Sequence, residues 1–448
     1  MRIYRKNSFG YYVYPVYNYL SFWFGVALAV VIGVSFILNL TYIQILADVR
    51  ALAFVVAVAT GLIEVVKVVN GSVKNKSVIR YFSSLLLADC IRHALLNTMT
   101  LNLYKDSPSV EMPQVKVVFV SNRIEVYVSK LAGMDDIEKL QSNIDSSFRG
   151  RFRPYAVTTA IQDDDGTGFR FVLENVGEDK TFIPHSIEDL KQKFYFVTLQ
   201  KGLTLNLSKF PHIAVWGQTG SGKTTVLMNI IAQCLSNNTD LYFIDGKTEF
   251  SSFSAFYPSE KIATDNADVL AMLKDVSEII MKRQKVVANE VKRRHKLGLT
   301  GFDMNLRPIV IIADEVGSVV ASMSSKEKKQ FVAFLTQIIQ KGRSVSVFLM
   351  TASQSPAVTV LPSDIRSQFS TKILLGSAIG DVQRMAFDMV ATNGGVDEFQ
   401  GYYMTSGKTI QPQKFFVPNL FKYDLENMQT FEGLYKWGKA NFEYKKRG

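Results

Sequence analysis

Cysteine is scarce in this chain of 448 residues: the two present, Cys90 and Cys234, lie far apart and form no CxxC pair. This scarcity excludes a disulfide framework and a zinc ribbon, and it favours a cytosolic setting for the chemistry. A chain of this length can bury a large core without cross-links or a structural metal.

Acidic residues are outnumbered by basic ones. The chain has 40 Asp and Glu against 51 Lys and Arg, a formal net charge of +11. An excess of this size fits a polyanionic partner or an anionic membrane surface. Hydrophobic residues make up 47% of the chain and charged residues 20%, a composition that excludes extensive disorder.

Charged residues are absent between Lys6 and Asp48. Within this stretch residues 20–40 are almost wholly apolar, and a helix of that length, at about 1.5 Å per residue, matches a hydrocarbon core of about 30 Å. A second apolar run follows at 51–69, which argues against a cleaved secretory signal. The pattern predicts a membrane anchor over residues 1–76 with two transmembrane helices, at about 20–40 and 49–69. One span followed by a buried helix is the alternative.

Basic residues flank the outer ends of this pair of apolar runs, whereas the segment between them carries only Arg50. Loops rich in Lys and Arg stay on the cytoplasmic side, so the sequence predicts a multi-pass protein of the cell membrane with both termini cytoplasmic. The flanking residues are Arg2, Arg5, Lys6, Lys67, Lys74, Lys76 and Arg80.

Two further segments follow the anchor. Residues 77–205 alternate helical and strand patterns and predict a small α+β domain. From residue 206 to 448 apolar strands alternate with long helical segments, which predicts an α/β domain with a mostly parallel sheet covered by helices on both faces. The strands are expected at 213–216, 241–244, 309–313, 345–350 and 372–375.

A phosphate-binding loop is the most specific signal in the sequence. It matches GxxxxGK[ST] completely and lies between an apolar strand and a helix, which is the context that the motif requires. Backbone N–H groups and the helix N-terminus would cradle the phosphates of ATP, Lys223 would pair with the β and γ phosphates, and Thr224 would ligate Mg²⁺. The predicted contacts are Gly217, Gln218, Thr219, Gly220, Ser221, Gly222, Lys223, Thr224 and Thr225.

Two acids follow the strand at 309–313. Asp314 is expected to hold Mg²⁺, and Glu315 is expected to polarise the water that attacks the γ-phosphate. A polar residue that senses the γ-phosphate should follow the strand lying between the phosphate loop and these acids, and Gln354 is the candidate. A helix-ending turn is the alternative interpretation of residues 351–356.

Basic residues crowd one predicted helix around residues 282–296. Lys292, Arg293 and Arg294 are candidates for contacts with a DNA backbone, and a solvated basic surface is the alternative. His212, just before the first strand, is interpreted as a structural hydrogen-bonding residue.

Five ordered motifs carry a resemblance to a known family: HIAVWGQTGSGKTT, FIDGKTEF, IVIIADE, KGRSVSVFLMTASQSP and IRSQFSTKILLG. Together they resemble the FtsK/SpoIIIE family of DNA-translocating ATPases over about residues 200–410. The resemblance implies a RecA-like P-loop core that assembles as a hexamer and drives double-stranded DNA through its pore. Within that hexamer Arg343 is the candidate for a finger that reaches a neighbouring subunit's nucleotide, with Arg366 and Arg384 as competitors.

The sequence also departs from the chromosome translocases of that family. Those carry four spans, a long linker and a winged-helix module, and the 38 residues after Ile410 are too few for such a module. Two spans, a small α+β domain and one motor domain resemble the TcpA-type coupling ATPases of Gram-positive conjugative elements, which implies a relaxase and secretion-channel proteins as partners. The leading hypothesis is therefore conjugative DNA transfer. A plasmid or chromosome segregation translocase, an ATPase of a protein secretion system, and a nucleotide-gated membrane scaffold are the alternatives.

Overall fold

The computed structural model consists of two compact units, Met1–Glu178 and Asp179–Gly448. The described residues are 2–6, 12–13, 20–40, 44–97, 109–120, 123–131, 134, 136–163, 165–356, 362–377, 380–391, 395–409 and 411–442.

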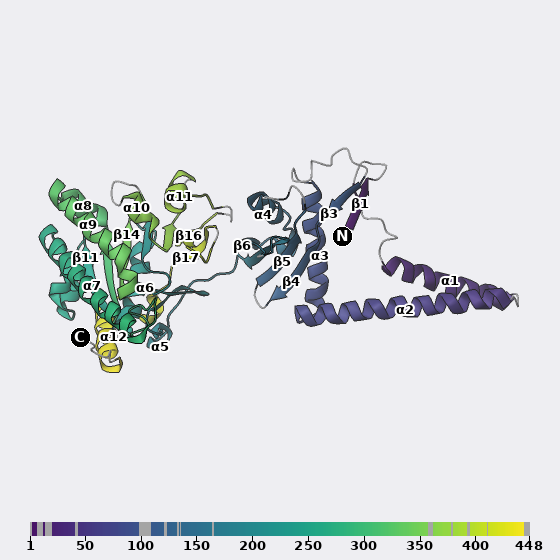
Figure 1. The fold of residues 1–448 in the computed structure, drawn as a ribbon, viewed down its shortest axis with the longest axis horizontal. Helices are drawn as coiled ribbons and strands as arrows, with labels where there is room; N and C mark the ends of the chain where they lie inside the picture. The colour runs from purple at the N-terminus through teal and green to yellow at the C-terminus, as the bar shows by residue number, and fades with distance from the viewer. Residues whose placement is uncertain are drawn as a thin grey trace. The chain divides into compact units, whose positions relative to one another are not determined.

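The N-terminal unit contains two helices in the region of the predicted anchor, α1 (Leu20–Leu40) and α2 (Gln44–Asn75) (Figure 1). Among the described residues, one helix, Arg50–Asn75, is long and apolar enough to cross a membrane by length and composition, and 6% of its most apolar window is buried. The apolar part of α1, Trp23–Ser35, is shorter than that criterion requires. Two spans therefore remain a prediction.

The α+β part of this unit is built on an antiparallel sheet with the order β4-β5-β7-β6. Helices α3 and α4 supply its apolar cover, with Leu87 and Ile91 of α3 and Leu140 of α4 fully buried in the shared core. Arg92 anchors α3 to the sheet by donating to the carbonyl oxygen of Val115 at 3.1 Å. The elements are α3 (Val78–Asn97), β4 (Val115–Val120), β5 (Arg123–Ser129), α4 (Ile137–Asp145), η3 (Gly150–Phe152), β6 (Tyr155–Gln162) and β7 (Gly168–Asn175), with a separate small sheet of β1 (Arg2–Lys6), β2 (Tyr12–Val13) and β3 (Ser109–Met112).

The C-terminal unit contains an eight-stranded sheet with the order β12-β11-β13-β14-β10-β15-β16-β17. The first six strands pair in parallel, and the last two pairings, β15 with β16 and β16 with β17, are antiparallel, so the prediction of a mostly parallel sheet is confirmed. The strands are β10 (Ile213–Gly217), β11 (Asp240–Asp245), β12 (Ile262–Ala263), β13 (Ile309–Asp314), β14 (Val347–Ser353), β15 (Thr371–Leu375), β16 (Gln400–Thr405) and β17 (Gln413–Phe416).

Helices cover both faces of this sheet, because alternate residues of each central strand are apolar on opposite sides (Figure 1). One face packs against α6 (Lys223–Ser236) and α12 (Met428–Asn441), and the other against α7 (Asn266–Arg294) and α9 (Ser325–Lys341). The shorter elements are α5 (Ile187–Leu190), β8 (Phe196–Gln200), β9 (Leu203–Asn206), η4 (Ser251–Ala255), η5 (Ser259–Lys261), α8 (Val316–Ser322), η6 (Gly342–Val345), α10 (Ser363–Ser367), α11 (Gly380–Phe387) and η7 (Phe421–Tyr423).

The two units divide after Glu178, whereas the sequence predicted a boundary at residue 205. The hairpin of β8 and β9 packs with the sheet of the C-terminal unit rather than with the α+β part. The N–H of Thr198 donates to Gln233 of α6 at 2.8 Å, and the side chain of Gln200 accepts from the N–H of Phe416 at 2.8 Å. Sequence pattern alone shows a strand pair here but not the sheet that it joins.

Candidate nucleotide-binding site

The phosphate loop connects the end of β10 to the first turn of α6. Gly220 and Gly222 have φ angles of 82° and 96°, a left-handed conformation that glycine adopts without strain. A Cβ at Gly222 would also lie 2.8 Å from Cγ1 of Val417. Gln218 and Thr219 are exposed at the tip. The loop thus presents its backbone to solvent, at the positive end of a 14-residue helix, as an anion site requires.

Lys223 is folded back onto this loop. Its ammonium donates to the carbonyl oxygen of Gly217 at 2.8 Å and to that of Gln218 at 3.0 Å. Burial lowers the pKa of Lys223, and the charge of Glu315 opposes that shift. The ammonium is therefore held at the mouth of the loop, where a phosphate would have to compete for it.

Asp314 ends β13 with a buried carboxylate, whose Oδ2 has no hydrogen-bond partner. Burial raises its pKa to about 6, with a further contribution from the nearby charge of Glu249. A desolvated carboxylate oxygen without a partner suits a hard divalent cation, and the Thr224 hydroxyl at the start of α6 is of the same oxygen class. The residues present therefore fit Mg²⁺.

Glu315 follows Asp314 in a left-handed conformation, with φ 48° and ψ 50°, and begins α8. Its side chain is 11% exposed, and Oε2 lies 2.9 Å from the ammonium of Lys247. The hydrogen bond with Glu315 raises the pKa of Lys247. Neither Lys247 nor Glu249 was assigned a role from the sequence. The available signal was their position after an apolar strand, β11, which the sheet order places beside β13.

Gln354 lies at the carboxyl end of a central strand. It follows β14, which is the strand between β10 and β13. Ala352 is in register with Asp314, and Ser353 is in register with Trp216 of β10. Gln354 is exposed at this edge between the phosphate loop and the acids, while its sensing role remains a prediction.

One family model matches a part of the C-terminal unit. Residues 188–303, which include the phosphate loop and Lys247 but end before Asp314, match the model of the FtsK/SpoIIIE family. The chain carries an FtsK/SpoIIIE-family domain. Members of this family are P-loop ATPases.

Two relatives from Bacillus subtilis are similar to about half of this chain. The Ftsk domain-containing protein YdcQ of Bacillus subtilis (strain 168) is 25% identical over 221 residues, which cover 47% of this chain and 45% of the relative. The DNA translocase SftA of the same strain is 24% identical over 233 residues, 48% of this chain and 24% of the relative. This chain thus spans less than half the length of both relatives. A solved structure of the pCW3 conjugation coupling protein TcpA, a monomer form with ATPγS, is 15% identical with a TM-score of 0.49, over 78% of this chain and 99% of that one.

Arg343 lies at the opposite edge of the eight-stranded sheet from the phosphate loop. It belongs to η6, which precedes β14, and its Nε donates to the carbonyl oxygen of Ser208 at 3.2 Å. The seven residues of β14 separate it from Gln354, a distance of about 23 Å at 3.3 Å per residue. Arg343 therefore takes no part in its own subunit's site, and only a neighbouring subunit could receive it. Of its competitors, Arg366 donates to the carbonyl oxygens of Pro356 and Met385, and Arg384 pairs with Asp381 at 2.8 Å.

The predicted basic surface lies on α7, and its members differ in their contacts. Lys292, Arg293 and Arg294 are exposed near the end of the helix, but both guanidinium groups pair with the carboxylate of Glu290. Arg283 is instead a structural residue, because it donates to the carbonyl oxygens of Val345, Ser346 and Arg307.

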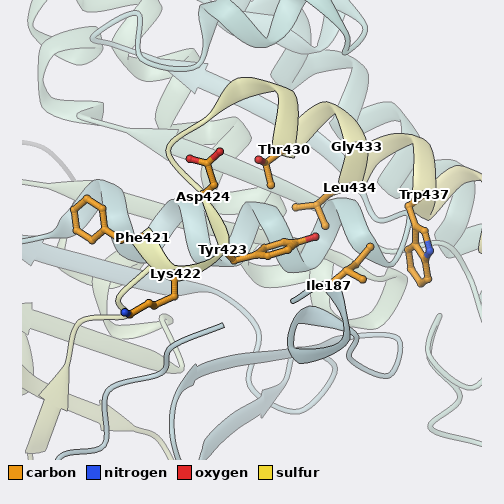
Figure 2. Close-up of a pocket in the computed structure, with 9 residues that line it drawn as sticks. All are labelled: Ile187, Phe421, Lys422, Tyr423, Asp424, Thr430, Gly433, Leu434 and Trp437. Atoms are coloured by element: carbon orange, nitrogen blue, oxygen red, sulfur yellow. The ribbon is translucent and has the colours of Figure 1, made fainter. Parts of the chain in front are cut away.

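A surface pocket of about 650 Å³ lies between η7, α12 and α5. Figure 2 shows Phe421 and Trp437 at its two ends, with Tyr423 and Leu434 between them. None of its lining residues belongs to the phosphate loop or to the acidic residues around Glu315. The pocket is therefore separate from the nucleotide site.

Proposed function

We propose that this chain is a membrane-anchored ATPase that hydrolyses ATP at the site described and moves double-stranded DNA as a coupling protein in conjugative transfer. The observation that carries the ATPase part is the convergence of three loops at one edge of the sheet. These loops follow β10, β13 and β14 and present Lys223, the pair Asp314 and Glu315, and Gln354.

In this proposal each residue has a separate role. The phosphate loop and Lys223 bind the β and γ phosphates, and Thr224 and Asp314 would hold Mg²⁺, which when bound neutralises phosphate charge. Glu315 accepts a hydrogen bond, and then a proton, from the attacking water. Gln354 donates to the γ-phosphate, and Arg343 of one subunit serves the site of the next in a hexamer.

Two substitutions test the hydrolytic assignment. Lys223→Ala should weaken nucleotide binding and abolish turnover, because a charge-assisted phosphate contact is lost. Glu315→Gln should retain binding but lower turnover by about 10² to 10⁴, because the amide cannot accept the proton. Phosphate release and the binding of a fluorescent ATP analogue are measured on the full-length protein. Wild-type turnover in Glu315→Gln would refute the assignment.

Conjugation is supported by the predicted order along the chain of a two-helix anchor, a small α+β domain and one motor domain. The competing function, segregation of plasmids or chromosomes, is favoured by relatives that are named DNA translocases. A strain that carries Glu315→Gln in place of the native chain separates the two. Loss of transfer to recipient cells with normal DNA inheritance supports conjugation, whereas normal transfer with anucleate cells or plasmid loss supports segregation.

The proposed topology has two spans and both termini in the cytoplasm, where ATP is available. Single cysteines introduced at Lys74 and Lys439, after replacement of Cys90 and Cys234, should resist an impermeant thiol reagent in intact cells. Both should react after permeabilisation. Labelling of either cysteine in intact cells would contradict the proposed orientation. It would place that residue outside the cell, where ATP is not available to an ATPase.

A further inference from the structure

The loop after β11 places a lysine against the proposed catalytic glutamate. Asp245 closes this loop by accepting hydrogen bonds from the N–H groups of Glu249 at 2.9 Å and Phe250 at 2.8 Å. Lys247 stands at the tip between them, so its backbone position is fixed by a turn that does not depend on its own side chain.

The tip is also packed tightly against the start of α8. A Cβ at Gly246 would lie 2.5 Å from Oγ of Ser318 and 3.0 Å from the carbonyl oxygen of Glu315. The Ser318 hydroxyl lies 3.2 Å from the carbonyl oxygen of Gly246 and 2.8 Å from that of Glu315. The backbones of Lys247 and Glu315 are thus held side by side.

The side chains of Lys247 and Glu315 differ in exposure and in flexibility. Glu315 is 11% exposed and sits on a left-handed backbone, whereas Lys247 is 36% exposed and ends in a flexible chain of four methylenes. Its ammonium lies 2.9 Å from Oε2 of Glu315. An ammonium at this distance hinders the approach of water to Oε2, one of the two oxygens with which the carboxylate could accept a proton.

We propose that Lys247 is a positioning residue that restrains Glu315 and so keeps the basal rate of ATP hydrolysis low. This inference rests on the proposed role of Glu315 in ATP hydrolysis. Lys223, Lys247, Glu249, Asp314 and Glu315 act on one another electrostatically. The ion pair of Lys247 and Glu315 is therefore part of a charge cluster that includes Lys223 of the phosphate loop.

Lys247→Met tests this inference, because methionine keeps much of the length of lysine without its charge. In full-length protein without DNA, kcat for ATP should rise roughly tenfold, since removal of the counter-ion frees the general base. The KM and the affinity for a fluorescent ATP analogue should stay within about twofold of wild type. Lys247→Arg should restore the low rate. Lys261→Met, which removes the ion pair with Asp240 at the amino end of the same strand, should leave kcat unchanged.

A second set of outcomes separates this inference from the proposed function. Lys247→Met combined with Glu315→Gln should turn over no faster than Glu315→Gln alone, because the gain acts through Glu315. An unchanged kcat in Lys247→Met would overturn the inference, and a lower kcat with raised KM would make Lys247 a phosphate ligand instead. If Glu315→Gln alone kept wild-type turnover, the proposed catalytic role would fail, whatever Lys247→Met did.

Discussion

Asp145 shows at the scale of one residue how burial changes the chemistry of a carboxyl group. It ends α4, and its Oδ1 accepts a hydrogen bond of 2.7 Å from the N–H of Val157 in β6. Burial nevertheless raises its pKa from the ordinary 3.8 to about 6. The folded protein therefore binds this proton at a higher pH than the unfolded chain, so the ionised carboxylate destabilises the fold above pH 6. The destabilisation fades as the pH falls to 3.8.

Asp145→Asn should stabilise the N-terminal unit at pH 7.5 by up to about 3 kcal/mol, because the amide oxygen accepts the same hydrogen bond without charge. The advantage over wild type should shrink steadily between pH 6 and 4. Denaturant unfolding of both proteins across this pH range measures it. An advantage that does not depend on pH would mean that Asp145 is not the titrating group.

His212 confirms a prediction made from its position in the sequence. Its Nδ1 accepts from the N–H of Leu349 at 3.0 Å, and Nε2 lies 3.1 Å from the carbonyl oxygen of Ile339. Burial lowers its pKa to about 4. The unfolded chain binds this proton first as the pH falls, so the stability that neutral His212 contributes is complete above pH 6.5 and is lost toward pH 4.

At the scale of elements, two helices of the C-terminal unit approach closely at a glycine. A Cβ at Gly438 of α12 would lie 2.0 Å from the carbonyl oxygen of Leu235 in α6. On the same helix Gly433 has nothing within 4 Å of its Cβ position. Substitutions at Gly438 and Gly433 therefore separate the effect of helix packing on stability from the effect of helix propensity.

Gly438→Ala should destabilise the C-terminal unit by about 1 to 3 kcal/mol, because backbone must move to admit the methyl group. Gly433→Ala should instead stabilise it by about 0.5 to 1 kcal/mol, the usual preference for alanine within a helix. Thermal unfolding of the two variants gives the comparison. Equal shifts for both would show that α12 does not pack against α6 in solution.

The basic end of α7 is the second element whose behaviour can be tested. Since Glu290 pairs with Arg293 and Arg294, Glu290→Gln should free both guanidinium groups for DNA and steepen the dependence of log K on log salt by up to about 2. Substitution of Lys292, Arg293 and Arg294 together by Gln should flatten it by up to about 3. Duplex binding is measured across salt concentrations, with the binding of an ATP analogue as the control. If neither change alters the slope, this end of α7 is a solvated surface.

At the scale of the whole molecule, the position of the hairpin β8–β9 decides which fragment can fold. Val197, Leu199 and Leu205 lie in the core of the C-terminal unit, and the Tyr195 hydroxyl bonds to the carbonyl oxygen of Leu306 and to Ser346. A fragment that starts at the predicted boundary loses all of these contacts.

Residues 179–448 should therefore fold as a unit that binds nucleotide, whereas residues 206–448 should be less stable by several kcal/mol, because several large apolar side chains leave the core. Thermal unfolding and the binding of an ATP analogue compare the two fragments. Equal stability would support the predicted boundary at residue 205 over the one that the contacts give.

The phosphate loop and the acids that follow β13 could be predicted from the sequence alone. Both are local: eight consecutive residues fix the loop, and a run of buried apolar residues places Asp314 and Glu315 at a strand end. The alternation of apolar strands and helical segments likewise predicted a mostly parallel sheet.

The contacts between residues far apart in the chain could not be predicted from the sequence. Lys247 and Glu315 pair because β11 and β13 are neighbours in the sheet, and sequence spacing carries no information about strand order. For the same reason Arg283 looked like part of a basic surface, although the carbonyl groups it binds belong to other segments. A local motif can be recognised from consecutive residues. Burial and side-chain pairing depend instead on which distant segments pack against a residue in the folded chain.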